Sequence, residues 1–281
     1  MLGRLYRRLP VVREVGPLTG ELRALRAAVL SASALQLHLE ASRSPRYREP
    51  KRLLASAFQV CSQNGEDGII QEIFRRIGTA DRTFLEIGVG NGVENNTAFL
   101  LSLGWRGYWI DCDGYFSARA RHAKKLRFAV AKVEPENARA LLADLGVPQE
   151  FDLLSIDIDH NTYYLWQALG HLKPRVVVVE YNSCVPAHVD WKVNYDGAVG
   201  WSGTQNFGAS LKALERLGRD LGYSLVGCDP MGCNAFFVRN DLTGDHFAMP
   251  FVAENHFEAA RFPFIHRLGH PNALLDIQED P

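Results

Sequence analysis

The feature that most constrains the fold of this chain is a regular alternation of apolar, strand-like segments with helix-like segments, starting near residue 58. Strands are expected at residues 82–89, 106–113, 127–133, 151–159 and 175–181. Helices are expected before and between them at residues 65–78, 95–104, 116–125, 137–146 and 162–172. Strands with continuous apolar cores that alternate with helices are typical of a parallel sheet covered on both faces. The sequence therefore predicts an α/β fold built on a doubly wound, mostly parallel sheet.

The end of this region departs from the alternation. A helix is expected at residues 209–222. Two strands then follow at residues 223–229 and 234–241, separated by a short turn that contains Gly232. This pattern predicts an antiparallel C-terminal strand at the end of the otherwise parallel sheet.

We expect three parts in the chain: an N-terminal helical extension with a basic linker at residues 1–57, the main domain at 58–242, and a C-terminal extension packed on the core at 243–281. Residues 18–42 have helical periodicity. Their apolar face consists of Leu22, Leu25, Ala28, Val29 and Ala32. We expect this helix to pack on the domain or on a partner, including a second copy of the chain in a homo-oligomer. Anchoring to a membrane surface is the alternative.

Charge and cysteine content restrict the classes of function. Among the 281 residues, 31 Lys and Arg nearly balance 32 Asp and Glu, so no overall field exists to hold nucleic acid, and no nucleic-acid partner is expected. The five cysteines form no CxxC pair and are odd in number, so reduced thiols and a cytoplasmic location are expected. No stretch approaches the roughly 18 apolar residues of a membrane span, so no transmembrane segment is expected.

A glycine loop follows the first strand, in the sequence "FLEIGVGNG", where Glu86 precedes Gly88, Gly90 and Gly92. A loop that binds phosphates would repel this acid. S-adenosylmethionine instead carries an amino group, a sulfonium cation and a ribose, so an acid beside the glycines favours it. Asp111, at the end of the next strand, is placed to accept hydrogen bonds from the ribose hydroxyls. We therefore predict that these five residues bind the cofactor; a purely structural turn is the alternative.

These motifs resemble a known family. "EIGVGNG" with "WIDCD" is similar to motif I and the second-strand acid of class I S-adenosylmethionine-dependent methyltransferases. "CSQNGEDGII", "SIDIDHNTYYLWQAL" and "KPRVVVVEY" resemble, in order and spacing, blocks of the FkbM-like branch. The resemblance covers roughly residues 58–240. It implies a Rossmann-like methyltransferase fold and, for many members of that branch, methylation of sugar or polyketide hydroxyls.

Polar residues also gather at the ends of the fourth and fifth strands. "SIDIDHN" places Asp157, Asp159 and His160 at one strand end, and "VVVVEYN" places Glu180 and Asn182 at its neighbour. Oxygen ligands of this kind suit a hard cation, so Asp157, Asp159, Glu180 and Asn182 are predicted to bind Mg²⁺ or Mn²⁺. In the alternative interpretation the aspartates cap the next helix and Asn182 holds a turn.

The same residues supply candidates for catalysis. Asp159-His160 is similar to an Asp-His dipeptide of metal-dependent O-methyltransferases of the catechol type, whereas Glu180-Tyr181-Asn182 departs from their acid-Asn pair by one inserted residue. Asp159 and His160 are therefore the predicted catalytic residues. His160 is either a general base, since a neutral imidazole can take a hydroxyl proton near pH 7, or a hydrogen-bonded structural histidine.

A long segment after the fifth strand, residues 184–208, carries aromatic residues among polar ones. They are Trp191, Tyr195, Trp201 and Phe207. Long loops at the functional edge of a sheet are commonly binding surfaces, and these aromatic rings suit a carbohydrate. Packing of the loop onto the sheet is the equally weighted alternative.

The sequence thus predicts a methyltransferase that transfers a methyl group from S-adenosylmethionine to a hydroxyl of a sugar, a glycan or a related small molecule. An NAD-dependent oxidoreductase with the same glycine loop is a second hypothesis; Glu86 and the absence of a GxGxxG pattern oppose it. A non-catalytic nucleotide-binding protein of the same fold is a third.

Overall fold

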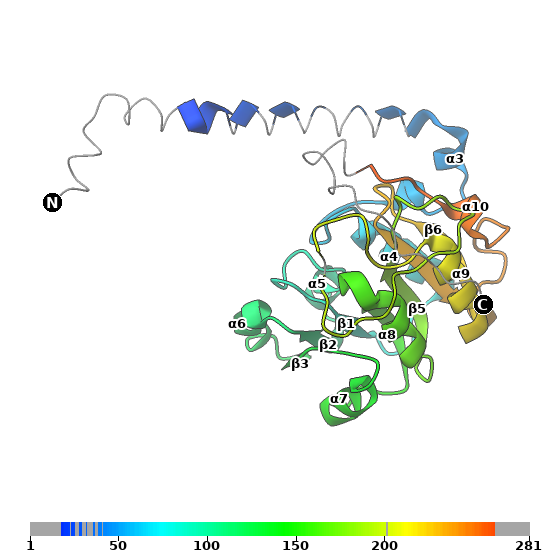
Figure 1. Ribbon diagram of the computed structural model, residues 1–281. Coiled ribbons are helices and arrows are strands. Elements are labelled where there is room, and N and C mark those ends of the chain that lie inside the picture. Colours follow the sequence, from blue (N-terminus) through cyan, green and yellow to red (C-terminus); the bar gives the residue numbers. More distant parts are fainter. Residues whose placement is uncertain are drawn as a thin grey trace, which may run out of the picture.

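The computed structural model describes residues 42–200 and 202–261, together with residues 18–22, 24–25, 28–29, 32, 36 and 39–40. A seven-stranded sheet in the order β3-β2-β1-β4-β5-β7-β6 forms its centre (Figure 1). The strands are β1 Thr83–Ile87, β2 Arg106–Asp111, β3 Leu126–Val130, β4 Glu150–Ile156, β5 Lys173–Glu180, β6 Tyr223–Cys228 and β7 Asn234–Arg239. The first five are parallel, and β7 runs antiparallel to both β5 and β6. The predicted doubly wound, mostly parallel sheet with an antiparallel C-terminal strand is confirmed, and the fold is α/β and Rossmann-like.

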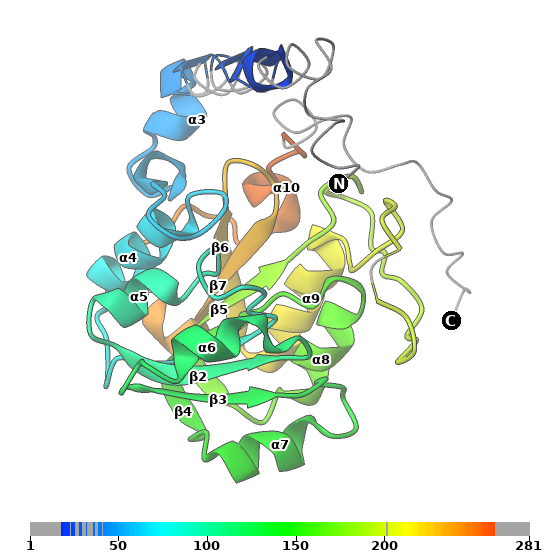
Figure 2. The same ribbon diagram turned by 90° about the vertical axis from the view of Figure 1, so that its left-hand side faces the viewer.

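Helices cover both faces of the sheet (Figure 2). One face packs on α4 Glu66–Ile77, α5 Ala98–Ser102 and α6 Ser117–Ala120. The other packs on α7 Ala138–Leu145, α8 Thr162–Ala168 and α9 Leu211–Leu221. Adjacent strand residues alternate between the two cores, so that Leu153 joins the α4 side and Leu154 the α8 side. The central strands β1, β4 and β5 are therefore buried on both faces, which explains their continuous apolar sequences, whereas β3 at the edge is largely half-buried or exposed.

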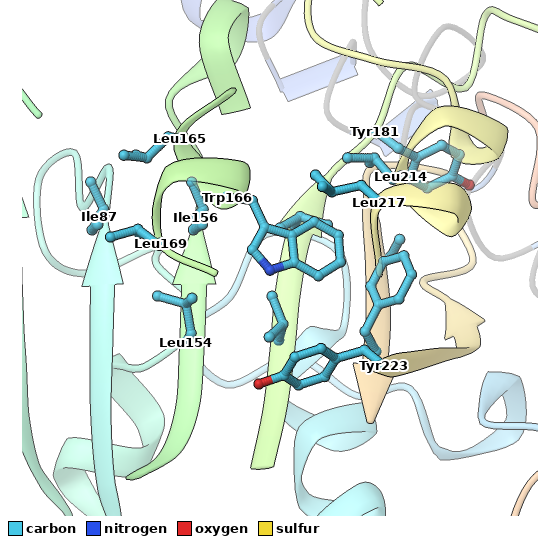
Figure 3. Packing of buried hydrophobic residues seen from close by; sticks show 14 of the residues in the cluster. Ile87, Leu154, Ile156, Leu165, Trp166, Leu169, Tyr181, Leu214, Leu217 and Tyr223 are labelled. Atoms are coloured by element: carbon cyan, nitrogen blue, oxygen red, sulfur yellow. The ribbon is translucent and has the colours of Figure 1, made fainter. Parts of the chain in front are cut away.

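The core under α8 and α9 is centred on Trp166, whose ring lies among the side chains of Leu154, Leu217 and Tyr223 (Figure 3). The ring of Trp166 packs in a tilted arrangement against that of Phe237 of β7, with 4.8 Å between the ring centroids. This aromatic contact links the parallel strands to the antiparallel pair, so the end of the sheet is held rigidly behind the strand ends that form the candidate site.

The segments on either side of the domain contact one another. The guanidinium of Arg46, in α3 Pro45–Arg48, forms an ion pair of 2.9 Å with Glu258. Arg52 donates to the carbonyl oxygen of Asn255, beside α10 Ala253–His256. Residues far apart in the sequence thus close around the β6 end of the sheet. Residues 262–281, part of the predicted C-terminal extension, lie outside the described residues.

The described positions between residues 18 and 40 are helical. Figure 1 shows them in a row that extends from α3 away from the domain. Leu22, Leu25 and Val29 are 59%, 62% and 55% exposed. These three side chains therefore do not pack on the described residues of the domain, and packing of the helix on the domain or on a partner stays a prediction. Among the described residues, no helix combines the length and the apolar character that crossing a membrane requires.

Candidate functional site

A cavity of about 640 Å³ lies where β1, β2, β4 and β5 end. This edge is where ligands bind in doubly wound sheets, and the volume falls in the range of small-molecule sites. The cavity joins the glycine loop after β1 to the acids after β4 and β5. Both predicted sites therefore open into one space.

The glycine loop is set by Gly88, whose φ of +88° suits glycine alone. A Cβ at Gly88 would lie 1.6 Å from the carbonyl oxygen of Asp157. Gly90 lines the cavity with nothing within 4 Å of a Cβ, whereas a Cβ at Gly92 would approach Phe116 to 3.0 Å. Gly88 thus allows the loop to touch the end of β4, Gly90 leaves room for a ligand, and Gly92 packs the loop onto the protein.

Glu86 is buried at the end of β1 and is already engaged by its own chain. Its carboxylate accepts hydrogen bonds from the side-chain amide of Asn95 (2.6 Å), the backbone N–H of Asn96 (2.8 Å) and the hydroxyl of Thr97 (2.5 Å). Burial raises the pKa of Glu86, and these bonds oppose the rise. The acid therefore holds the loop that leads into α5, and its predicted contact with a cofactor stays a prediction.

Asp111 ends β2 beside the glycine loop. Its Oδ2 accepts from the backbone N–H of Gly90 at 2.8 Å, and its Oδ1 accepts from that of Asp113 at 2.8 Å. An ionised carboxylate has about four lone-pair sites, so both oxygens keep acceptor capacity toward the cavity. The arrangement fits the predicted ribose contact, which stays a prediction.

Three acids after β4 and β5 converge into what we call the acidic cluster: Asp157, Asp159 and Glu180. One carboxylate oxygen from each lies within 4.8 Å of the others. Asp157 opens onto the cavity while protein encloses its remaining sides, and this enclosure together with the charge of Asp159 raises the pKa of Asp157. Burial and the charges of Asp157 and Asp159 raise the pKa of Glu180, whose Oε2 is buried with no hydrogen-bond partner among the described residues. Asp159 has a φ of +59°, a conformation that non-glycine residues adopt at a cost and often at functional sites.

Two predicted site residues lie elsewhere. Asn182 is fully buried, and its amide nitrogen donates to the carbonyls of Gln205 (2.8 Å) and Phe207 (3.0 Å). Its Oδ1 accepts from the backbone N–H of Cys184 at 3.1 Å. Because both ends of the amide hold the loop after β5, Asn182 is a loop anchor, which corrects its predicted role as a metal ligand. His160 is buried in the turn Asp159–Asn161 and is not one of the cavity-lining residues, so its position does not favour a general base.

The cavity also contains residues that the sequence did not single out. Asn234 starts β7 directly opposite Glu180, and its side-chain oxygen is buried with no hydrogen-bond partner in the part of the chain that the structure describes. Its amide nitrogen donates to Glu66 at 2.8 Å, and Glu66 also accepts from the backbone of Asn64. Asn64 and Glu66 belong to the block "CSQNGEDGII", which was the signal in the sequence that could have identified them. The sequence contained no such signal for Asn234, because only the pairing of β7 with β5 brings this residue to the cavity.

The charge of the cavity is strongly negative. Its lining contains nine acids: Glu66, Glu86, Glu94, Asp111, Asp113, Glu134, Asp157, Asp159 and Glu180. Among the described lining residues Lys132 is the single cation, and it is paired with Glu134 at 2.9 Å. The arrangement therefore favours cationic ligands and disfavours phosphates.

The loop after β5 covers one side of the cavity, which Val199 and Gly200 line. Trp191 and Phe207 are buried, so these two rings pack the loop onto the domain. Tyr195 is 38% exposed, and its hydroxyl donates to Glu136 at 2.7 Å. Trp201 lies outside the described residues.

No protein-family model and no curated protein matches the sequence. Solved structures with a similar fold include cofactor-bound Rv0187 from MTB, at 17% identity and a TM-score of 0.44, covering 73% of this chain and 96% of that one. A Burkholderia thailandensis 1,6-didemethyltoxoflavin-N1-methyltransferase with bound S-adenosylhomocysteine has 12% identity, a TM-score of 0.40 and coverages of 75% and 89%. The O-methyltransferase TomG from Streptomyces achromogenes has 19% identity, a TM-score of 0.38 and coverages of 72% and 89%. Identities and TM-scores this low indicate a similar fold and leave the activity of this chain to the residues of its own site.

Proposed function

We propose that this chain is an S-adenosylmethionine-dependent O-methyltransferase of the FkbM-like kind, acting on a hydroxyl group of a sugar, a glycan or a related small molecule. The observation that carries the proposal is the charge of the cavity, where nine acids accompany one lysine that is already paired. Such a cavity attracts a sulfonium and an amino group and repels the phosphates of a dinucleotide.

The glycine loop and Asp111 would hold the cofactor. Gly88 and Gly90 let the backbone approach the ligand closely, and Asp111 would accept hydrogen bonds from the ribose hydroxyls. The hydrogen bond from the N–H of Gly90 to Asp111 fixes the position of the glycine loop relative to this carboxylate. Glu86 would contribute negative charge near the amino group and would fix the loop through Asn95, Asn96 and Thr97.

The proposed reaction is the in-line attack of an acceptor hydroxyl on a methyl group. S-adenosylmethionine, when bound, supplies that methyl group on a sulfonium that leaves as a neutral thioether. Asp157 and Asp159 line the cavity beside the glycine loop, so they are suited to orient the hydroxyl and to accept its proton. Holding the two reactants in line would supply most of the acceleration.

The acidic cluster is proposed to bind Mg²⁺ or Mn²⁺. Three carboxylates held within 4.8 Å repel one another, and a divalent cation would relieve this repulsion. The unpartnered Oε2 of Glu180 fits an oxygen ligand that lacks its ion. Such a cation, when bound, lowers the pKa of a coordinated hydroxyl.

The acceptor is proposed to be a polyol because the cavity wall has unsatisfied hydrogen-bond acceptors. The side-chain oxygens of Asn95 and Asn234, apart from the acidic cluster, are buried without partners among the described residues. Hydroxyl groups donate to such oxygens, whereas an anionic acceptor would be repelled by the surrounding acids. Tyr195 adds a partly exposed ring suited to a sugar face.

Calorimetry with S-adenosylmethionine, S-adenosylhomocysteine and NAD tests the cofactor. We expect the first two to bind and NAD not to bind. Binding of NAD alone would overturn the methyltransferase proposal in favour of an oxidoreductase. Binding of the two adenosyl ligands without any methyl transfer to polyols would favour the non-catalytic alternative.

The metal is tested separately by adding a chelator and then Mg²⁺ or Mn²⁺, with ion binding measured by calorimetry alongside turnover. We expect chelation to abolish methyl transfer and to leave S-adenosylhomocysteine binding largely intact, since the cofactor contacts lie on β1 and β2. Asp159→Asn should lose the ion, whereas Glu94→Gln, at an exposed acid elsewhere in the cavity, should keep it. Full activity of the metal-free protein would refute the metal site.

A further inference from the structure

The N-terminal extension carries a heptad pattern. Seven residues, which we call the seam, follow one another at spacings of four and three residues in strict alternation. They are Leu18, Leu22, Leu25, Val29, Ala32, Gln36 and Leu39. Six of the seven are apolar. A repeat of 3.5 residues is the pattern of a coiled-coil seam, whereas a helix that covers a globular domain follows 3.6 residues and has a wider apolar face.

All seven seam positions belong to the described residues, and all are exposed. Among the described residues, the first contact along the sequence between this part of the chain and the C-terminal segments is the ion pair of Arg46, in α3, with Glu258. Figure 2 shows the described pieces of the extension above the domain, clear of the sheet and of α9. Among the described residues, none covers these seven side chains.

We propose that a second copy of the same chain covers the seam, forming a parallel, two-stranded coiled coil through residues 18–39. In heptad notation the d positions are Leu18, Leu25, Ala32 and Leu39, and the a positions are Leu22, Val29 and Gln36. Leucine occupies three of the four d positions, and the β-branched Val29 occupies the central a position; leucine at d with a β-branched residue at a favours two parallel strands. A single polar residue at a, here Gln36, fixes register and oligomeric state because it pairs with its own copy.

Charges beside the seam agree with a parallel arrangement. In the heptad register Glu21 takes a g position, and the sequence places Arg26 five residues later at the following e position. In a parallel dimer g pairs with the next e of the partner helix, so Glu21 would face Arg26 of the second copy in both directions. An antiparallel pair would lose this match.

The seam spans only three heptads, about 33 Å of helix, so its free energy of association is modest and the dimer should dissociate on dilution. Three further leucines, Leu30, Leu35 and Leu37, fall outside the seam in the sequence. They make adsorption to a lipid surface the competing outcome of the test.

Light scattering on the full chain, over a range of concentrations, tests the dimer. We expect a dimer that dissociates at least tenfold more readily in Leu25→Asp, because this charge enters the seam. Ala24→Asp, one residue away at a c position outside the seam, should dimerise as the unchanged chain does. A monomer at all concentrations, or an equal effect of the two variants, would overturn the proposal, as would binding to anionic vesicles by a chain that is monomeric in solution.

Cysteine crosslinking tests the parallel register independently of stability. Under mild oxidation Ala32→Cys should join two chains through position 32, because equivalent d positions meet in a parallel pair. Ala24→Cys should give no more crosslinked product than the five native cysteines do. Peptide mapping identifies the bond, and a bond from position 32 to any other position would contradict the parallel register.

Discussion

At the scale of single residues, the cavity brings several carboxylates close together despite the repulsion between their charges. Glu86 accepts hydrogen bonds from four donor groups of its own loop, so its charge is satisfied within the chain. The three acids of the acidic cluster instead line the cavity, with one carboxylate oxygen of each within 4.8 Å of the others. The same residue type therefore has two roles, one in loop structure and one open to a ligand.

Asp111 provides the first prediction. Asp111→Asn should weaken S-adenosylhomocysteine binding about tenfold or more, since one charge-assisted hydrogen bond contributes on the order of 1.5–3 kcal/mol. The amide can still accept from the N–H of Gly90, so the fold should be kept. Calorimetry gives the affinity and circular dichroism the folding control. Asp113→Asn is the matched variant, and if it alone weakens binding, the ribose acid is Asp113.

The acidic cluster provides the second prediction, which concerns stability. Without divalent cations at pH 8, Asp157→Asn should raise the free energy of unfolding by about 1 kcal/mol, because it removes repulsion from Asp159 and Glu180. The same change should abolish methyl transfer. Thermal unfolding with and without Mg²⁺ measures the effect, and Mg²⁺ should stabilise only the unchanged chain. Glu94→Gln is the control, and a destabilised Asp157→Asn would contradict mutual repulsion.

At the scale of elements, the sequence was sufficient for the order and type of the strands and helices, because buried parallel strands leave continuous apolar runs. Boundaries were less predictable. The helix expected at residues 116–125 is shorter in the structure, where a 3-10 turn is followed by α6 Ser117–Ala120. It ends early because Leu126 already belongs to β3, where it pairs with Gly107 of β2.

The residues of the candidate site could be predicted where they follow one strand directly in the sequence. They could not be predicted where strand pairing or a returning loop decides their position. Asp157 and Asp159 follow one strand, so the sequence placed them together. Asn234 enters only through the register of β7 with β5. Asn182 has the position expected of a ligand, but the chain returns over it and occupies both ends of its amide.

The loop after β5 provides the third prediction. Asn182→Asp would be favourable if this residue bound a metal, but it should be unfavourable for a loop anchor, because a carboxylate cannot donate to the carbonyls of Gln205 and Phe207. We expect a loss of about 1–3 kcal/mol in the free energy of unfolding. Trypsin should also cut faster after Lys192. Unchanged stability with tighter Mg²⁺ binding would restore the metal-ligand role.

At the scale of the whole molecule, two segments far apart in the sequence close one end of the sheet. Arg46 and Arg52 reach the segment around α10, where His256 is 3% exposed and stacks on Phe251. Burial, reinforced by the charges of Arg52 and Arg46, lowers the pKa of His256 to about 3. Protonation of this imidazole would therefore oppose the contact between the two segments.

This closure provides the fourth prediction. Between pH 6.5 and 3 the unfolded chain binds a proton at His256 that the folded chain does not, so stability is full above pH 6.5 and falls as the pH drops through this window. At pH 5 the loss relative to pH 7 should be about 2 kcal/mol. Denaturant unfolding at the two pH values measures it in the unchanged chain and in His256→Gln, which cannot be protonated.

In His256→Gln the difference between the two pH values should shrink by that amount, even if the variant is less stable at pH 7, because the test compares slopes with pH rather than absolute stabilities. His122→Gln replaces an exposed histidine and should leave the acid dependence unchanged. Because α10 holds the segment that leads into the N-terminal extension, loosening at low pH should begin there, with faster hydrogen exchange in residues 246–258 than in β1 and β4. Equal acid dependence of all three chains would show that the imidazole of His256 does not control this closure.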